Sequence, residues 1–153
     1  TTDGAIVMAS TGTGGAISSV WVRNSNIINP VLSAVNVFGD NVDNISITNN
    51  TIVDCDNGLG GAIIVNAADN IDVSNNTLKV GERNKKPAYL VEILAGVINI
   101  ICSNNNAASA VLVSPILDDS GDVVKSITGN IGYNPLPQRS VVVGASPYTY
   151  KNT

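Results

Sequence analysis

Two carboxylates separated by 26 residues, Asp56 and Glu82, are the candidates for catalysis in this chain. The separation matches the internal repeat described below, so stacked repeats would place both side chains on one face. Glycosidases cleave with two carboxyl groups about 5 to 9.5 Å apart, and this is the chemistry that the spacing could support. Arg83, next to Glu82, could hold a sugar acid. The alternative interpretation is that both carboxylates are solvated charges at loop tips.

Composition excludes most other chemistry. The 153 residues include no His and only two Cys, and the net charge is −4. Without His no Ser-His-Asp or Cys-His relay can form, and two Cys supply a zinc ion with at most two good ligands. Residues 118–122 offer hard oxygens but lack the complete spacing of a calcium loop, which favours a plain turn. We therefore expect no metal and no cofactor, and the acidic balance disfavours nucleic acid as a partner.

An internal repeat organises the chain. Residues 43–52 recur as residues 69–78 with identity at six of ten positions, and weaker copies lie on either side. Within each copy apolar and polar residues alternate, which is typical of a half-buried strand, and an Asn-rich corner follows. Successive copies are 25, 26, 29 and 25 residues apart when they are aligned on inward-facing residues. The aligned residues are Val22, Ile47, Val73, Cys102 and Ile127.

Repeats of this length cannot bury an apolar face alone, so they must stack. The sequence predicts an all-β fold, a right-handed parallel β-helix of about five coils of roughly 25 residues each, over residues 1–132. Stacking would align Asn residues in a ladder at one corner, where Asn tolerates the left-handed (αL) conformation and its amide can bond to the next coil. The predicted ladder consists of Asn24, Asn49, Asn75 and Asn104.

Three features depart from the regular repeat. The extra residues of the 29-residue step, 81–87, are the most charged run in the chain and predict a projecting loop. Lys125 falls on an inward position, which predicts either a bulge or the end of the regular coils. Trp21 falls on an outward position, aligned with Ser46, Asp72 and Ile101, and could stack on a sugar or contact another subunit.

The chain beyond Gly132 differs in composition and carries a resemblance. Residues 133–153 are rich in Tyr and Pro, and because Pro blocks strand pairing they are predicted to cap the solenoid or to join subunits. Gly-Tyr-Asn-Pro at 132–135, the following Val-rich strand and the final Ser-Pro-Tyr-Thr-Tyr-Lys-Asn-Thr resemble the close of β-helix proteins of phage and virus tailspikes, tail fibres and neck appendages. The resemblance implies a homotrimer on the virion surface, in contact with other virion proteins and with host cell-surface glycans.

The expected function is that of a structural and host-glycan-binding module of a receptor-binding appendage. Trp21 and Arg83 are its candidate ligand contacts. Two alternatives stay open: a polysaccharide depolymerase that uses Asp56 and Glu82, and a purely architectural virion component.

Membrane insertion is not expected. The most apolar stretch, residues 89–102, has 14 residues and is interrupted by Glu92 and Asn99. The chain begins with Thr rather than Met, which indicates a fragment or a processed piece. Cys55 and Cys102 could be paired or free, and free buried thiols are favoured.

Overall fold

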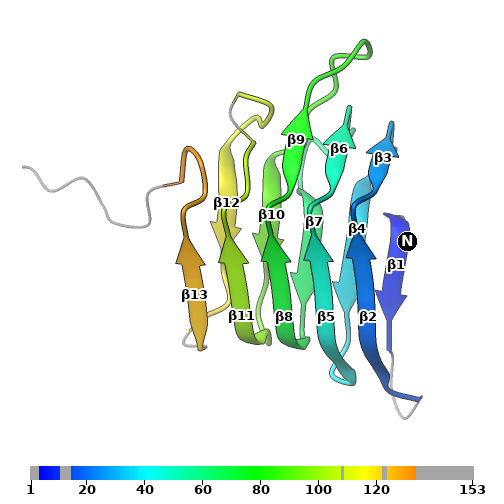
Figure 1. Ribbon diagram of the computed structural model, residues 1–153, viewed down its shortest axis with the longest axis vertical. Helices are drawn as coiled ribbons and strands as arrows, with labels where there is room; N and C mark the ends of the chain where they lie inside the picture. The colour runs from blue at the N-terminus through cyan, green and yellow to red at the C-terminus, as the bar shows by residue number, and fades with distance from the viewer. Residues whose placement is uncertain (1–3, 11–14, 108, 122–123, 134–153) are drawn as a thin grey trace, which may run out of the picture.

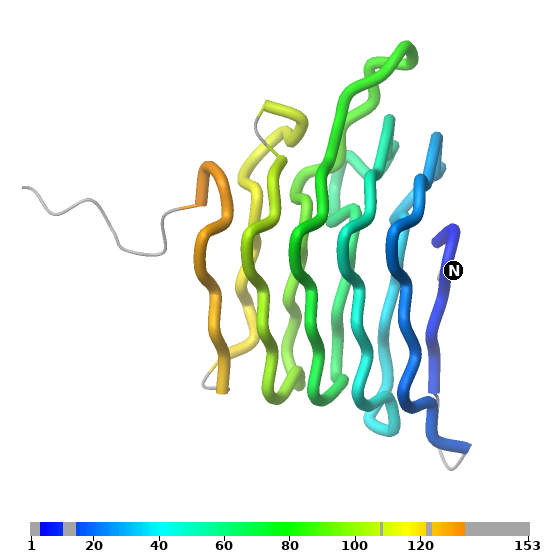
Figure 2. The backbone as a smooth tube through the Cα atoms, in the orientation of Figure 1, coloured from blue at the N-terminus to red at the C-terminus, as the bar shows by residue number. Residues whose placement is uncertain are grey.

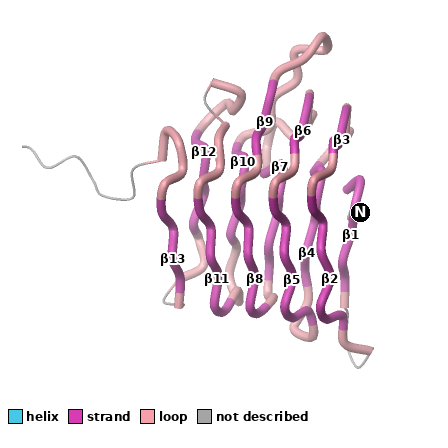
Figure 3. Tube along the Cα trace, viewed as in Figure 1, coloured by secondary structure: helices cyan, strands magenta, loops and turns pink. Residues whose placement is uncertain are grey.

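The computed structural model describes residues 4–10, 15–107, 109–121 and 124–133, and strands dominate these ranges (Figure 1). Figure 3 shows no helix among the described residues, and none there could cross a membrane. The described strands are β1 (Gly4–Ala9), β2 (Ile17–Arg23), β3 (Asn26–Ile28), β4 (Ser33–Phe38), β5 (Val42–Thr48), β6 (Thr51–Val53), β7 (Gly61–Asn66), β8 (Asp69–Ser74), β9 (Thr77–Lys79), β10 (Tyr89–Ile93), β11 (Ile98–Ser103), β12 (Ser114–Asp118) and β13 (Lys125–Thr128).

These strands form three parallel sheets. Sheet A has the order β1-β4-β7-β10-β12, sheet B the order β13-β11-β8-β5-β2, and sheet C the order β3-β6-β9. In Figure 1 the chain climbs through sheet B, continues upward through the short strands of sheet C, and then turns to descend through sheet A before it enters the next coil; Figure 2 shows the same path. The molecule is therefore a parallel β-solenoid of about five turns, as the repeat predicts.

Strand register confirms the predicted alignment of the coils. Val22 pairs with Ile47, Ile47 with Val73, Val73 with Cys102, and Cys102 with Ile127. The loop predicted over residues 81–87 does leave the body after β9, and it projects beyond the neighbouring coils in Figure 2.

The core lies between sheets A and B and is almost entirely aliphatic. Sheet A contributes the row Val35, Ile63 and Val91, and sheet B contributes Ile45, Ile71 and Ile100; all six are at most 2% exposed. Full burial of one such side chain contributes roughly 1.5 to 3 kcal/mol. Cys55 and Cys102 are free thiols within this core, as favoured by the sequence.

The corner after sheet B carries the Asn-rich turn. In coils two to four, one Asn of the turn adopts the αL conformation, and the Asn that follows it forms the amide ladder. Asn24, Asn49, Asn75 and Asn104 adopt positive φ angles of 52 to 58° and are exposed. The amide ladder predicted for these four is made instead by the next residue, because the αL turn rotates the following side chain inward. This inner ladder consists of Asn50, Asn76, Asn105 and Asn130.

The amide of Asn76 shows how the inner ladder is bonded. The Oδ1 of Asn76 accepts bonds from the backbone N and the Nδ2 of Asn50, at 3.1 and 3.0 Å. Its Nδ2 donates to the Ile47 carbonyl at 2.8 Å and to the Oδ1 of Asn105 at 3.0 Å. Buried polar groups are stable only when they are paired in this way.

The fifth coil places two charged side chains at positions that are apolar in the preceding coils. Asp118 is in register with Ile93, and Lys125 is in register with Ile100, so both occupy rows that are apolar in the preceding coils. Their side chains meet in an ion pair of 2.7 Å. Lys125 therefore sits in a regularly paired strand. The predicted capping segment after Tyr133 lies outside the described residues.

Candidate functional site

Of the two predicted catalytic carboxylates, Asp56 follows β6 and Glu82 lies in the loop that follows β9. The 26-residue offset holds as far as the pairing of Val53 with Lys79, after which the chain turns outward. Asp56 forms a 3.1 Å ion pair with Lys85, and Glu82 is exposed in the projecting loop. The structure thus gives the Asp56 carboxylate a cation, Lys85, as its ion-pair partner.

A buried carboxylate holds that loop in place. Asp54 is 2% exposed, and it accepts backbone N–H bonds from Gly81, Arg83 and Lys85 at 2.8, 2.9 and 3.2 Å. Burial would raise the pKa of Asp54, but these three hydrogen bonds outweigh it and the pKa is lowered. The backbone of Arg83 is therefore anchored, and the residue is exposed to solvent.

The two thiols are poor nucleophiles. Burial raises the pKa of Cys55 to about 11 and that of Cys102 to about 12. Because the thiolate is the reactive form, both groups are inert near neutral pH. The described residues also hold no cluster of three or more metal-ligating side chains. Asp118, in the predicted turn, is instead bonded to Ser120 and Lys125.

Trp21 lies on the outer face of sheet B, as the alignment predicts. It is 57% exposed and in register with Ser46, which continues the row through Asp72 and Ile101. The Arg23 guanidinium lies 5.6 Å from the centre of the Trp21 ring and donates to the Ser46 hydroxyl at 3.1 Å. The ring is thereby held against the sheet with most of its surface in solvent.

A second line of αL residues crosses sheet B within the strands themselves. Ser19, Asn44, Asn70 and Asn99 have φ angles of 58, 55, 51 and 56°. An αL residue interrupts the regular alternation of a strand, as in a bulge, and it redirects the neighbouring side chains. We call these four residues the outer row. The row was not predicted from the sequence, where the only signal was an Asp-Asn pair directly before the inward Ile in coils two and three.

The outer row is tied together across coils by exposed hydrogen bonds. The Nδ2 of Asn70 donates to Asp43 at 2.8 Å, and the Nδ2 of Asn99 donates to Asp69 at 3.0 Å. The amide oxygens of Asn70 and Asn99 accept no hydrogen bond from the residues that the structure describes. They are therefore left to accept bonds from solvent or a ligand.

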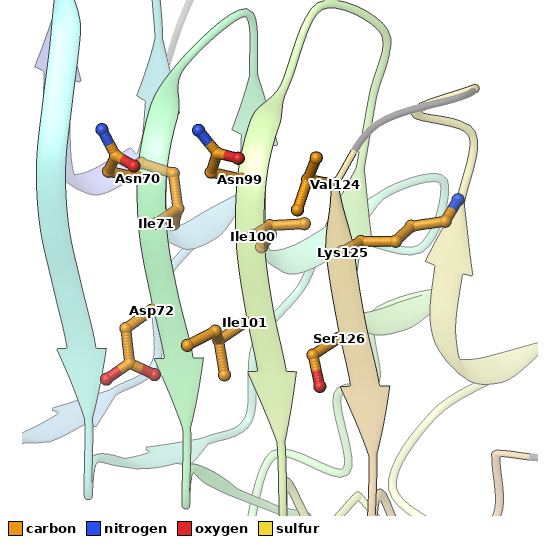
Figure 4. Close-up of a pocket in the computed structure, with 9 residues that line it drawn as sticks. All are labelled: Asn70, Ile71, Asp72, Asn99, Ile100, Ile101, Val124, Lys125 and Ser126. Atoms are coloured by element: carbon orange, nitrogen blue, oxygen red, sulfur yellow. The ribbon is translucent and has the colours of Figure 1, made fainter.

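A shallow groove of about 420 Å³ follows this row over β8, β11 and β13 (Figure 4). Asn70 and Asn99 lie along one side, whereas Asp72, Ile101 and Ser126 lie along the other. Ile101 is 51% exposed and Val124 is 73% exposed, so two aliphatic surfaces stand beside the amides. The site can therefore offer apolar contact and hydrogen-bond acceptors together.

Comparison with known proteins adds no assignment to this geometry: no protein-family model, no curated protein and no solved structure matches the chain.

Proposed function

We propose that this chain is a structural and glycan-binding module of an extracellular receptor-binding appendage, such as that of a virion. Its binding surface is the outer face of sheet B. The observation that supports this is the groove, in which the exposed amides of Asn70 and Asn99 stand beside the exposed aliphatic side chains of Ile101 and Val124. Saccharides present hydroxyl groups and apolar C–H faces, and this combination complements both.

The stacking of the coils supports an extended ligand. Adjacent coils are about 4.8 Å apart, so the groove presents an amide at regular steps along the solenoid axis. A polysaccharide lying along that axis would meet Asn44, Asn70 and Asn99 in three successive coils. Trp21, on the same face, adds an aromatic platform on which a sugar ring can stack. Many weak contacts of this kind give affinity through repetition.

Affinity electrophoresis through gels that contain mannan, curdlan, amylose or a purified envelope polysaccharide tests the proposal. We expect at least one neutral polymer to retard the protein, and Asn99→Gly to reduce that retardation severalfold. Asn29→Gly is the matched control, because Asn29 is also exposed with a φ of 57° but lies outside sheet B. Equal loss in both variants, or no retardation by any polymer, would contradict the proposal.

The same incubations distinguish the depolymerase alternative. New reducing chain ends that disappear in the Asp56→Asn and Glu82→Gln variants would support catalysis. Retention without new ends supports binding alone.

Self-association is the second part of the proposal, with a homotrimer as the expected state. Aliphatic residues in the turns that lead into sheet A support it, since Val31, Leu59 and Leu112 are 72, 97 and 59% exposed. Apolar surface repeated in several coils is typical of an interface. Light scattering should give three times 15.7 kDa, and a monomer would contradict the trimer.

A further inference from the structure

The outer face of sheet B carries an excess of negative charge. Asp72 lines the groove, and Asp43 and Asp69 accept hydrogen bonds from the groove-lining amides of Asn70 and Asn99. The cation nearest the groove is Lys125, whose ammonium turns away to Asp118 and to the carbonyl of Gly121 (Figure 4). Arg23 lies at the far end of the sheet, where it bonds to Ser46. The groove is therefore bordered by carboxylates with no free cation among the described residues that line it.

The hydrogen bonds on this face also determine which polar atoms the groove offers to a ligand. Asn70 and Asn99 each donate from Nδ2 to a carboxylate of the preceding coil, so part of their donor capacity is used within the protein. Asp72 accepts the Ser74 hydroxyl at 2.6 Å through Oδ1, and its Oδ2 accepts no hydrogen bond among the described residues. What the groove presents outward is mainly acceptor oxygen. A complementary ligand must donate hydrogen bonds and must not bring its own carboxylates.

We infer that the groove selects uncharged, hydroxyl-rich saccharides and discriminates against glycans that carry carboxylate or sulfate groups. This inference rests on the proposed glycan-binding function and specifies its ligand class. The discrimination is electrostatic, so it depends on ionic strength. At low salt the three carboxylates should weaken the binding of an acidic polymer by on the order of tenfold, and screening should reduce that difference as salt rises.

The test uses chemically matched polymers and the whole chain. Mannan, curdlan and amylose are each compared with the same polymer after oxidation of its primary hydroxyls to carboxylates, and with the methyl ester of that oxidised form. The ester lacks the charge but keeps the altered carbon, so it separates charge from the loss of a hydroxyl. Retardation is measured by affinity electrophoresis at about 20 mM and about 300 mM salt.

We expect the neutral and esterified polymers to bind about tenfold more tightly than the carboxylate form at low salt. The difference should shrink at high salt, and it should disappear in the triple variant Asp43→Asn, Asp69→Asn, Asp72→Asn. The salt series on the unmodified protein supplies the same information if that variant unfolds. Equal or tighter binding of the carboxylate form would overturn the selectivity while leaving glycan binding intact. Failure of every polymer to bind would instead overturn the proposed function, and the inference with it.

Discussion

Two rows of Asn residues run along the solenoid, and their comparison shows how burial separates structure from recognition. In the inner ladder Asn50, Asn76 and Asn105 are at most 1% exposed, and their amides bond to one another and to strand carbonyls. In the outer row Asn70 and Asn99 are exposed, and their amides donate hydrogen bonds to the carboxylates of Asp43 and Asp69. Because a buried amide without a partner is costly and an exposed one is not, we expect the inner ladder to contribute far more to stability than the outer row.

The largest expected effect is in the inner ladder. Asn76→Ala removes four hydrogen bonds and leaves the Ile47 carbonyl and the Asn50 amide groups buried without that partner. Each unsatisfied buried group costs about 1 to 3 kcal/mol, so the free energy of unfolding should fall by roughly 3 kcal/mol or more. Urea unfolding followed by circular dichroism measures this change.

Asn75→Gly is the matched control for that variant. Asn75 is adjacent and exposed with a φ of 57°, a conformation that Gly adopts without strain. Its free energy of unfolding should stay within about 0.5 kcal/mol of the unmodified protein. Similar losses in the two variants would remove the distinction between buried and exposed Asn.

A smaller effect is expected at the fifth coil, where the ion pair of Asp118 and Lys125 occupies rows that are apolar in the preceding coils. Partial burial would raise the pKa of Asp118, but hydrogen bonds from Lys125 and Ser120 outweigh it and the pKa is lowered. A carboxyl with a lowered pKa stabilises the fold above its unfolded pKa of about 3.9, and this contribution is lost as pH falls through the folded value. Asp118→Asn should therefore reduce the loss of stability between neutral pH and low pH.

Thermal unfolding from pH 7 downward follows this difference. Asp118→Asn should melt at a lower temperature than the unmodified protein at neutral pH, and the two curves should converge below about pH 3. Parallel curves across the whole range would show that the ion pair does not contribute to stability.

The smallest expected effect on stability is in the outer row. Asn70→Gly keeps the αL conformation and removes one exposed hydrogen bond to Asp43, so the free energy of unfolding should change by less than about 0.5 kcal/mol. Glycan retardation should nevertheless fall severalfold, because the amide borders the groove. A variant that loses stability and keeps its binding would reverse the roles of the two rows.

The fold was predictable from sequence because a repeat reports strand register directly. Inward Ile and Val recur at fixed steps, and the aligned residues do pair in the structure. The ladder was placed one residue early because adjacent Asn residues, such as Asn49 and Asn50, are equivalent by composition. Only the geometry of the αL turn decides which of the two is buried.

The candidate site was harder to predict for a physical reason. Asp56 and Glu82 satisfy the repeat spacing, but that spacing does not reveal that Asp54 binds three backbone N–H groups of the loop that carries Glu82. The groove, in turn, depends on positive φ angles within strands, which the alternation of apolar and polar residues does not reveal. The outward position of Trp21 was predictable because it follows from the period alone.

Hydrogen–deuterium exchange with the neutral polysaccharide that retards the protein most tests the central claim most directly. Ligand-dependent protection should appear in residues 70–72, 99–101 and 124–126, which line the groove on the outer face of sheet B. Protection confined to the loop at residues 81–87, or to the turns that carry Val31 and Leu59, would contradict the assignment of the outer face as the binding surface.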